Sequence, residues 1–395
     1  MRVIGIVLAA GLGKRMKSKL HKVLHPVCGK PLLGHVLDTL DAVNADRKIV
    51  VVGHGAESVQ AYVGDRAEFA MQAEQLGTGH AVLQARPLLE NEEGVAIILY
   101  GDAPLVRASS IREMIRMLGE HGAAGAMLTA KFDNPYGYGR IVRAADGTVE
   151  RIVEQKDCGP KENEIQEINA GTYCFDIRKL FAALSEVKND NAQNEYYLTD
   201  VIAILRAKGE KVIAYCTDDP AESLGINDRI QLAEAERAMR ERINRDHMRN
   251  GVTMIDPDRT YIDKDVRIGA DTVLYPGTVL RGKTVIGEQC AIGPDTEIAD
   301  SVISDHVKIR HSVLTEAEVG SGVTIGPFAH LRPGSRLASG VKIGNFVEIK
   351  NATLGEEAKA SHLSYIGDAQ VGSNVNIGCG AITVNYDGYN KHRTI

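Results

Sequence analysis

The sequence has no tryptophan, and aromatic residues make up 5% of its 395 positions. Its core is therefore predicted to be built from aliphatic side chains. No apolar stretch reaches the roughly 18 residues that a membrane-spanning helix needs. The apolar run 3–10 is short and is followed at once by Lys14 and Arg15, so a buried parallel strand explains it better than a signal peptide. We predict no membrane insertion.

An excess of basic residues is also missing, because 46 Lys and Arg stand against 52 Asp and Glu, for a formal net charge of −6. A nucleic acid partner is therefore not expected, although a local basic cluster can still hold a small phosphate compound. The cysteines form no CxxC pair, which argues against a zinc knuckle or a disulfide framework and fits reduced thiols in the cytoplasm. They are Cys28, Cys158, Cys174, Cys216, Cys290 and Cys379.

The length predicts two domains, and the first 228 residues alternate strand-like and helical patterns. This alternation indicates βαβ units, with a parallel sheet covered by helices on both faces. In such sheets ligands bind at the carboxyl ends of the strands. Strand-like runs occur at 3–8, 48–52 and 95–100, and amphipathic stretches at 31–43 and 78–90. A long charged helix then covers 228–250, with Gly251 as its C-cap, and is predicted to connect the domains.

Beyond residue 250 an internal repeat appears, in which an aliphatic residue returns every six positions and is often followed by glycine. An α-helix would scatter such residues around its circumference, whereas a triangular coil with a six-residue strand on each side stacks them inward. The glycine then lies at the corner, where the backbone turns sharply. This pattern predicts a hexapeptide parallel β-helix. The two unbroken runs are Ile268, Leu274, Leu280, Ile286, Ile292 and Ile298, and Val319, Ile325, Leu331, Leu337, Ile343 and Ile349.

The segment Leu8–Met16 follows the first predicted strand and is rich in small residues, with Lys14 and Arg15 near its end. Its backbone can approach phosphates closely. It is not a Walker loop, and a Rossmann fingerprint would need a third glycine at Met16. Taken alone, the segment is weak evidence for phosphate binding.

Further motifs make the prediction specific. Together they resemble, over nearly the whole chain, the bacterial bifunctional N-acetylglucosamine-1-phosphate uridylyltransferases / glucosamine-1-phosphate acetyltransferases. The resemblance implies a Rossmann-like nucleotidyltransferase domain at 1–228, a linker helix at 229–250 and a left-handed β-helix at 251–395. His21 departs from the proline that many members have. The motifs are Lys22-Val-Leu-His-Pro26, Gly29-Lys-Pro31, Gln72, Gln75-Leu-Gly-Thr78, Gly101-Asp-Ala-Pro-Leu105, Gly137-Tyr-Gly-Arg140, Asn169-Ala-Gly-Thr172 and Gly225-Ile-Asn-Asp228.

The first implied reaction is attack of the sugar phosphate on the α-phosphorus of UTP, with pyrophosphate leaving. The nucleophile is already an anion, so positioning and charge neutralisation suffice. Asp102 and Asn227 are expected to hold Mg²⁺, although a Gly-Asp-Ala-Pro turn also suits a helix cap. Arg15 and Lys22 are expected to be the catalytic cations. The resemblance assigns UTP and the UDP-sugar to Leu8, Ala9, Ala10, Gly11, Lys22, Gln72, Gly77, Thr78, Gly139, Glu154, Asn169 and Asn227. Of these, Leu8 to Gly11, Gln72, Gly77 and Thr78 are expected to hold the uridine, and Gly139, Glu154 and Asn169 the N-acetylsugar.

The second implied reaction is acetyl transfer from acetyl-CoA to glucosamine-1-phosphate. The amine must first lose a proton, and His362 is expected to be the general base. Cys379 stands where alanine is common and is expected to be a small packing residue, while His306, His311 and His330 are expected at the surface. The resemblance assigns the sugar phosphate to Arg332, Lys350, Tyr365 and Asn376, and acetyl-CoA to Cys379, Asn385 and Tyr386. A homotrimer through the β-helix is expected.

Three alternatives stay open at this point: an ADP-glucose or GDP-mannose type enzyme, an inactive regulatory subunit, and a β-helix that serves as a trimerisation scaffold alone. The first does not predict His362-Leu-Ser-Tyr365 together with Lys350 and Asn385-Tyr386. The second should have lost at least one of Arg15, Lys22, Asp102 or Asn227, and all four are present. The sequence stops at residue 395 without an obvious capping unit. We therefore expect an incomplete β-helix and an impaired acetyl transfer.

Overall fold

The computed structural model describes residues 1–11, 13–53 and 55–395. The contacts divide the chain into two compact units, Met1–Glu236 and Arg237–Ile395. The long charged pattern forms helix α8 (Arg229–Arg249), in which the division falls. None of the helices formed by the described residues has the length and hydropathy of a membrane span.

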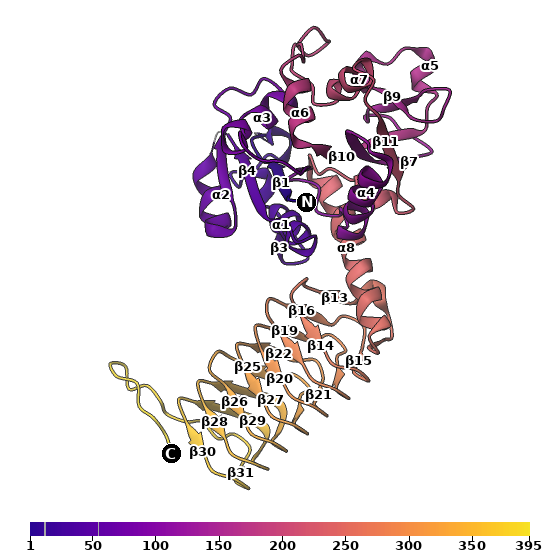
Figure 1. The fold of residues 1–395 in the computed structure, drawn as a ribbon. Coiled ribbons are helices and arrows are strands. Elements are labelled where there is room, and N and C mark those ends of the chain that lie inside the picture. Colours follow the sequence, from indigo (N-terminus) through magenta and orange to yellow (C-terminus); the bar gives the residue numbers. More distant parts are fainter. Residues whose placement is uncertain (12, 54) are drawn as a thin grey trace. The chain divides into compact units, whose positions relative to one another are not determined.

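A nine-stranded sheet forms the centre of the first unit (Figure 1). β1 pairs in parallel with β4 on one side and β6 on the other, so the three predicted strands lie side by side. Buried aliphatic side chains cover both faces of the sheet, as the uninterrupted apolar runs require. The strands are β1 (Val3–Leu8), β4 (Arg47–Val52), β5 (Glu68–Met71), β6 (Val95–Tyr100), β7 (Gly125–Lys131), β8 (Arg140–Arg143), β9 (Val149–Val153), β10 (Glu167–Asp176) and β11 (Val212–Cys216).

The sheet is mixed, so the prediction of a parallel sheet is wrong in one respect. β10 lies between β6 and β7 and runs antiparallel to both. Its register with β7 shifts between Asn169 and Tyr173. An apolar pattern shows that a strand is buried but not the direction in which it pairs, which is why the sequence did not reveal this strand's orientation.

Helices flank the sheet, as the alternating pattern predicted. The stretch 31–43 forms α1, but the stretch 78–90 is helical only as far as Leu83 and continues as a 3₁₀ turn at Arg86–Leu88. Pro87 has no amide hydrogen to continue the α-helical ladder. The helices are α1 (Leu32–Ala42), α2 (Ala56–Val63), α3 (Thr78–Leu83), α4 (Ala108–His121), α5 (Pro160–Asn163), α6 (Ile177–Leu184) and α7 (Asp200–Ala207), with a small ribbon of β2 (Pro26–Val27) and β3 (Lys30–Pro31).

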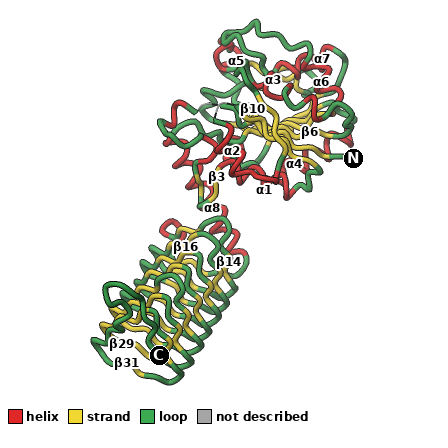
Figure 2. The backbone as a smooth tube through the Cα atoms, turned by 90° about the vertical axis from the view of Figure 1, so that its left-hand side faces the viewer, coloured by secondary structure: helices red, strands yellow, loops and turns green. Residues whose placement is uncertain are grey.

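The second unit is a parallel β-helix, whose stacked coils are visible in Figure 2. One face holds β12 (Thr253–Met254), β15 (Val273–Leu274), β18 (Ala291–Ile292), β21 (Lys308–Ile309) and β24 (Thr324–Ile325). The next holds β13 (Tyr261–Ile262), β16 (Val279–Arg281), β19 (Glu297–Ala299), β22 (Val313–Thr315) and β25 (His330–Leu331). The third holds β14 (Arg267–Ile268), β17 (Val285–Ile286), β20 (Val302–Ile303), β23 (Glu318–Val319), β26 (Arg336–Leu337), β28 (Thr353–Leu354) and β30 (Gln370–Val371). β27 (Lys342–Lys350) pairs with the first two faces and with β29 (Lys359–Gly367), which pairs with β31 (Asn376–Ile377).

The repeated aliphatic residues stack as predicted. Ile268 lies opposite Ile286 in the ladder, and Leu274 lies opposite Ile292. Most strands are two or three residues long, however, rather than six. The rest of each hexapeptide forms the turn between two faces.

The glycines that follow the aliphatic residues have a different cause from the one predicted. A Cβ on Gly269 would lie 2.7 Å from the backbone of the next coil, and one on Gly344 would lie 1.9 Å from Ser361 O. These glycines therefore allow close stacking of coils. The left-handed corner is instead formed by later residues such as Asp271 and Gln289, with φ of 60° and 55°.

Candidate active sites

The carboxyl ends of β1 and β6 lie side by side in the first unit, with Leu8 opposite Tyr100. The Gly101 amide donates to the Leu8 carbonyl at 2.9 Å. The loops that follow the two strands therefore begin at the same point, and a pocket of about 200 Å³ opens there. It is lined by Leu8, Ala9, Ala10, Gly11, Lys22, Val23, Gln72, Gln75, Gly77, Thr78, Ala81, Tyr100, Asp102 and Glu195. Leu12, in the predicted phosphate-approaching segment, lies outside the described residues.

One side of the pocket is built by the loop before α3. The Gln72 side-chain amide donates to the Gly77 carbonyl at 3.1 Å, and the Gln75 amide donates to the Ala10 carbonyl at 2.6 Å. Gly77 has a φ of 112°, and a Cβ there would lie 2.7 Å from Tyr196 O. Only glycine fits this position. The structure thus brings together all seven residues predicted to hold the uridine.

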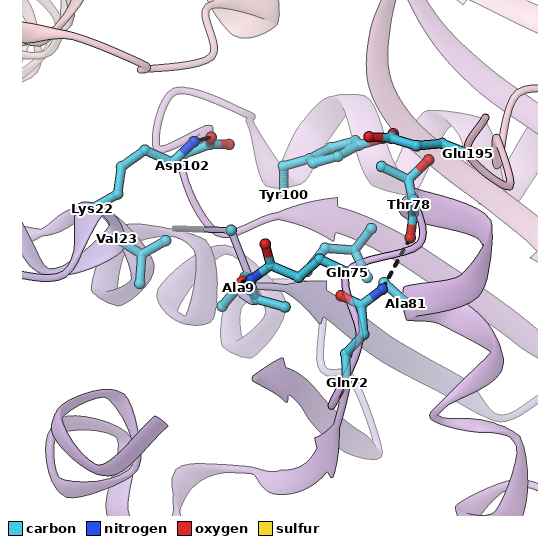
Figure 3. Close-up of a pocket in the computed structure, with 14 residues that line it drawn as sticks. Ala9, Lys22, Val23, Gln72, Gln75, Thr78, Ala81, Tyr100, Asp102 and Glu195 are labelled. Atoms are coloured by element: carbon cyan, nitrogen blue, oxygen red, sulfur yellow. Dashed lines mark hydrogen bonds and ion pairs between the residues drawn. The ribbon is translucent and has the colours of Figure 1, made fainter. Parts of the chain in front are cut away.

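The opposite side of the pocket carries charge, where the ammonium of Lys22 and the carboxylate of Asp102 point toward one another (Figure 3). The Lys22 ammonium also lies 3.3 Å from the Asn227 side-chain oxygen. The amide of Ile226 donates to the Asp102 carbonyl at 3.0 Å, which joins the two loops. Two oxygen ligands from distant segments therefore converge on one cation.

These oxygen donors fit a Mg²⁺ ion. Lys22 stands in for the cation, and a carboxylate plus an amide oxygen are the hard ligands that Mg²⁺ prefers. No group of three or more His, Cys, Asp or Glu side chains able to hold a metal occurs among the described residues. The other ligands of the ion would then be substrate phosphates and water, which is common for Mg²⁺.

Arg15 lies apart from the lining of this pocket. It is exposed, on the 3₁₀ turn Lys14–Met16. The turn nevertheless contacts the pocket through Gly13, where a Cβ would lie 2.6 Å from the Lys22 Cβ. Arg15 is therefore close in the chain to the charged side of the pocket, and its flexible side chain faces solvent.

The three residues predicted to hold the N-acetylsugar form a cluster of their own. The backbone amide of Asn169 donates to the Gly139 carbonyl at 2.9 Å. A Cβ on Gly139 would lie 3.5 Å from both Glu154 carboxylate oxygens. Burial raises the pKa of the Glu154 carboxyl, against a hydrogen bond from the Thr199 hydroxyl that lowers it. The side-chain amide of Asn169 donates to the Tyr173 hydroxyl at 2.6 Å.

Tyr100 connects this cluster with the pocket, and the sequence analysis missed it. Its ring lies between the charged side of the pocket and Thr78 in Figure 3. A Cβ on Gly171 would lie 2.9 Å from the same ring. Burial, followed by the nearby Glu154 carboxylate, raises the pKa of the Tyr100 hydroxyl above its ordinary range. Its place at the end of a strand, directly before Gly101, was the available signal.

Glu195 also lines the pocket and had no predicted role. It belongs to a loop that packs on the start of α3, where the Tyr196 carbonyl accepts the Gly79 amide hydrogen at 2.8 Å. The Leu198 amide donates to the Thr78 hydroxyl at 3.1 Å. No motif in this stretch pointed to the nucleotide site, because its contribution depends on long-range packing.

In the second unit, three predicted residues meet around a carboxylate that the sequence analysis did not name. Lys350 lies 3.4 Å from Asp368, and the Asn385 amide donates to the same carboxylate at 2.5 Å. The Tyr365 hydroxyl lies 3.2 Å from the Asn385 amide. Hydrogen bonds, first from Asn351 and then from Asn385, lower the pKa of Asp368. Asp368 therefore organises this group as an anion.

His362 is exposed and contacts Asn345, another residue without a predicted role. The His362 Nδ1 and the Asn345 Oδ1 are 2.8 Å apart. Because an amide oxygen accepts, Nδ1 carries the hydrogen, and Nε2 of the neutral ring is left as the acceptor. This is the arrangement that a general base needs. Arg332 forms an ion pair with Glu348 at 2.8 Å.

The remaining predicted residues lie near the last coils. Asn376 is exposed and pairs with Lys359 through the backbone. Tyr386 is exposed and donates to the Gly388 carbonyl at 2.8 Å. Cys379 is exposed rather than packed in the interior, two residues after the end of β31.

Two family models match the chain. The MobA-like NTP transferase domain matches residues 5–193, and the six-repeat bacterial transferase hexapeptide matches residues 316–351. A solved structure titled as UDP-glucose pyrophosphorylase complexed with UDP-glucose covers 61% of this chain and 100% of its own, with a TM-score of 0.51 and 19% identity. At this identity the likeness shows the fold alone. The class is a nucleotidyltransferase joined to a hexapeptide-repeat acyltransferase.

Curated relatives extend over almost the entire chain. Bifunctional protein GlmU from Geobacillus sp. (strain WCH70) is 58% identical over 389 residues, which is 98% of this chain and 85% of that protein. Bifunctional protein GlmU from Brevibacillus brevis is 54% identical over 393 residues, 100% of this chain and 85% of that protein.

The chain therefore belongs to the bifunctional GlmU family. It makes UDP-N-acetylglucosamine, by acetyl transfer from acetyl-CoA to glucosamine-1-phosphate and by uridylyl transfer from UTP to N-acetylglucosamine-1-phosphate. The predicted family, fold and pair of activities are confirmed, and the alternatives of another sugar nucleotidyltransferase or an inactive subunit are excluded. The impairment of acetyl transfer that the sequence led us to expect is not tested by these comparisons and stays a prediction.

Proposed function

We propose that the pocket at the ends of β1 and β6 is the uridylyl-transfer site and that Asp102 and Asn227 are its Mg²⁺ ligands. The observation that carries this proposal is the position of the Lys22 ammonium between the oxygens of Asp102 and Asn227. A bound Mg²⁺ would supply neutralisation of the charge on the triphosphate and on the pyrophosphate that leaves. Lys22 then turns toward the phosphates, and Arg15 adds a second positive charge from its exposed turn.

The sugar phosphate needs no base in this reaction, so the protein's task is to hold two anions in line. The loop that contains Gln72, Gly77 and Thr78 holds the uridine beside the small residues Ala9 to Gly11. Gly139, Glu154 and Asn169 hold the N-acetylsugar, with Tyr100 between them and the nucleotide. Fixed donors and acceptors at these positions exclude water and orient the attacking oxygen.

For acetyl transfer we propose that His362 takes the proton of the sugar amine at Nε2, while Asn345 fixes the ring through Nδ1. Arg332 and Lys350 neutralise the sugar phosphate, and Tyr365 and Asn376 contact the sugar. Cys379, Asn385 and Tyr386 contact acetyl-CoA. The amine attacks the thioester directly, so the exposed thiol of Cys379 does not act as a nucleophile.

A homotrimer through the β-helix is proposed as the working assembly. A ridge of large side chains, which we call the corner ridge, supports it: His311, Phe328, Phe346 and Leu363. The rings of Phe328 and Phe346 stack at 5.4 Å, yet each residue is 56% exposed. All four have positive φ, which is uncommon for bulky residues. Such an apolar ridge is typical of a surface that a second copy covers.

The cytoplasmic location is proposed from cysteine usage alone.

One assay separates the two activities. Pyrophosphate release from UTP is measured with N-acetylglucosamine-1-phosphate and with glucosamine-1-phosphate, each with and without acetyl-CoA. We expect pyrophosphate release from N-acetylglucosamine-1-phosphate with or without acetyl-CoA. With glucosamine-1-phosphate we expect pyrophosphate release only when acetyl-CoA is present. Release with glucosamine-1-phosphate at a comparable rate in the absence of acetyl-CoA would contradict the proposal that the acetylated sugar phosphate is the uridylyl acceptor.

A further inference from the structure

Glu222 is a buried carboxylate with no role in the proposed chemistry. It is 1% exposed and lies on the 3₁₀ turn Pro220–Ser223, in the segment that leads from β11 to Asn227. One carboxylate oxygen accepts from the Arg107 amide at 2.9 Å. The other accepts from the hydroxyls of Ser110 and Thr217, at 2.9 and 2.8 Å.

These contacts connect the two loops that carry the proposed metal ligands. Arg107 is the N-cap residue of α4 and ends the loop that begins at Gly101 and contains Asp102. Thr217 begins the segment that ends at Asn227, and Asp219 of the same segment forms an ion pair with the Arg107 guanidinium. Glu222 therefore holds the loop of one ligand against the loop of the other.

The electrostatics explain how a carboxylate is tolerated at this depth. No salt bridge to Glu222 occurs in the parts of the chain that the structure describes, so its charge is balanced by hydrogen-bond donors and by the N-terminus of α4. A buried anion without these donors would be costly. Loss of the carboxylate would leave the three donors unpaired and release the two loops from each other.

We propose that Glu222 is a positioning residue for the divalent metal site, which fixes the separation of Asp102 and Asn227. The inference rests on the proposed function, because it assumes that these two residues hold the metal. Groups that orient metal ligands commonly change metal affinity about 10–100-fold when they are removed. A residue that merely stabilised the fold would change the melting temperature and leave the affinity for the metal unaltered.

The test measures Mn²⁺ binding to the full chain in the presence of UDP-N-acetylglucosamine, from the electron paramagnetic resonance signal of the free ion. Glu222→Ala is expected to weaken Mn²⁺ binding about tenfold. In Glu222→Gln the side-chain oxygen can accept from Arg107 while its amide donates to the two hydroxyl oxygens, so most of the affinity should return. Asp176→Ala is the matched control, since Asp176 caps α6 through the Lys179 amide and touches neither loop.

Two further variants keep each outcome decisive. Asp102→Ala must weaken Mn²⁺ binding; if it does not, the proposed metal site itself is wrong. If Asp102→Ala weakens binding and Glu222→Ala does not, the positioning role is overturned while the metal site stands. Should Glu222→Ala fail to fold, Thr217→Val decides, because it removes one donor and keeps the shape. Unchanged Mn²⁺ affinity in Thr217→Val would then overturn the inference, and a loss of about threefold would support it.

Discussion

The ammonium of Lys22 forms an ion pair with the carboxylate of Asp102 and lies 3.3 Å from the side-chain oxygen of Asn227. A lysine and a divalent cation cannot share the same oxygen ligands, because like charges at this distance repel. Entry of a metal therefore requires Lys22 to move away. The triphosphate of UTP offers the displaced ammonium a new partner, so nucleotide and metal should bind together.

Lys22→Met should accordingly strengthen metal binding in the absence of nucleotide, while it weakens catalysis. Removing a charged hydrogen-bonding group of this kind changes affinity by about tenfold. The rate of pyrophosphate release should fall by about 100-fold or more, since the charge that neutralises the triphosphate is lost. Mn²⁺ titration of the nucleotide-free protein checks the first effect. Weaker Mn²⁺ binding in the variant would show that Lys22 does not compete with the metal.

Glu154→Gln should stabilise the protein at neutral pH. Burial raises the pKa of this carboxyl above its ordinary value of 4.5, so the folded state favours the protonated form. At low pH the buried Glu154 carboxyl is protonated and does not destabilise the folded state. As the pH rises through the raised pKa the carboxyl ionises, and the folded state becomes less stable relative to the unfolded chain. The variant's melting temperature should exceed that of the wild type at pH 7.5, and the difference should shrink toward pH 4.5. A shift of about 2 °C would correspond to roughly 1 kcal/mol in a domain of this size.

The control for this prediction is Glu150→Gln, which changes an exposed carboxylate on the same strand, β9. It should leave the melting temperature unaltered across the same pH range. A gain for Glu154→Gln that is equal at pH 4.5 and pH 7.5 would contradict the assignment, because the effect would not follow the titration of the carboxyl.

Asn345→Ala should slow acetyl transfer by about tenfold and leave uridylyl transfer unchanged. Without the amide oxygen, the His362 ring can carry its hydrogen on either nitrogen, so the fraction with a free Nε2 falls. Thiol release from acetyl-CoA and pyrophosphate release from UTP are measured on the same preparation. His330→Ala is the control, since His330 is exposed on β25. Equal thiol release from Asn345→Ala and the wild type would show that this hydrogen bond does not orient the base.

Phe346→Ser should weaken the proposed trimer. The substitution removes the ring that stacks on Phe328 in the corner ridge. The surface that a second copy is proposed to cover therefore loses apolar area. Light scattering over a dilution series should show dissociation at a higher protein concentration than for the wild type. Ile230→Ser, which changes a residue 73% exposed on α8, should have no such effect. Identical dilution profiles for Phe346→Ser and the wild type would place the ridge outside the interface.

Local pattern was enough to predict the elements whose residues carry a simple period. The ladder of Ile268 and Ile286, and the strand ends at Leu8 and Tyr100, followed from repetition of apolar residues. The direction of β10 could not be predicted in this way, because antiparallel and parallel pairing leave the same apolar pattern. The turn glycines were also misassigned, since the distance between coils that requires Gly269 is not encoded in its own neighbours.

The predicted uridine residues and Asp102 met in one pocket because they lie at or after strand ends, where a parallel sheet gathers its loops. Asn227 does not line the pocket but reaches its charged side through Lys22. Tyr100 and Glu195 were missed for opposite reasons. Tyr100 was taken as part of a buried strand, and Glu195 enters the pocket from a loop whose position depends on packing against α3. Asn345 and Asp368 were missed because their contacts join residues about one coil apart, which a six-residue period does not indicate.

The turnover of the Asp102→Ala variant at saturating Mg²⁺ tests the account most directly. Pyrophosphate release from UTP and N-acetylglucosamine-1-phosphate is measured at saturating Mg²⁺, with a thermal melt and light scattering on the same sample. Loss of a charged group that holds the neutralising ion should lower turnover by about 1,000-fold or more, while the melt and the oligomeric state stay as in the wild type. Turnover close to the wild-type value at saturating Mg²⁺ would contradict the assignment of Asp102 and Asn227 as the metal site.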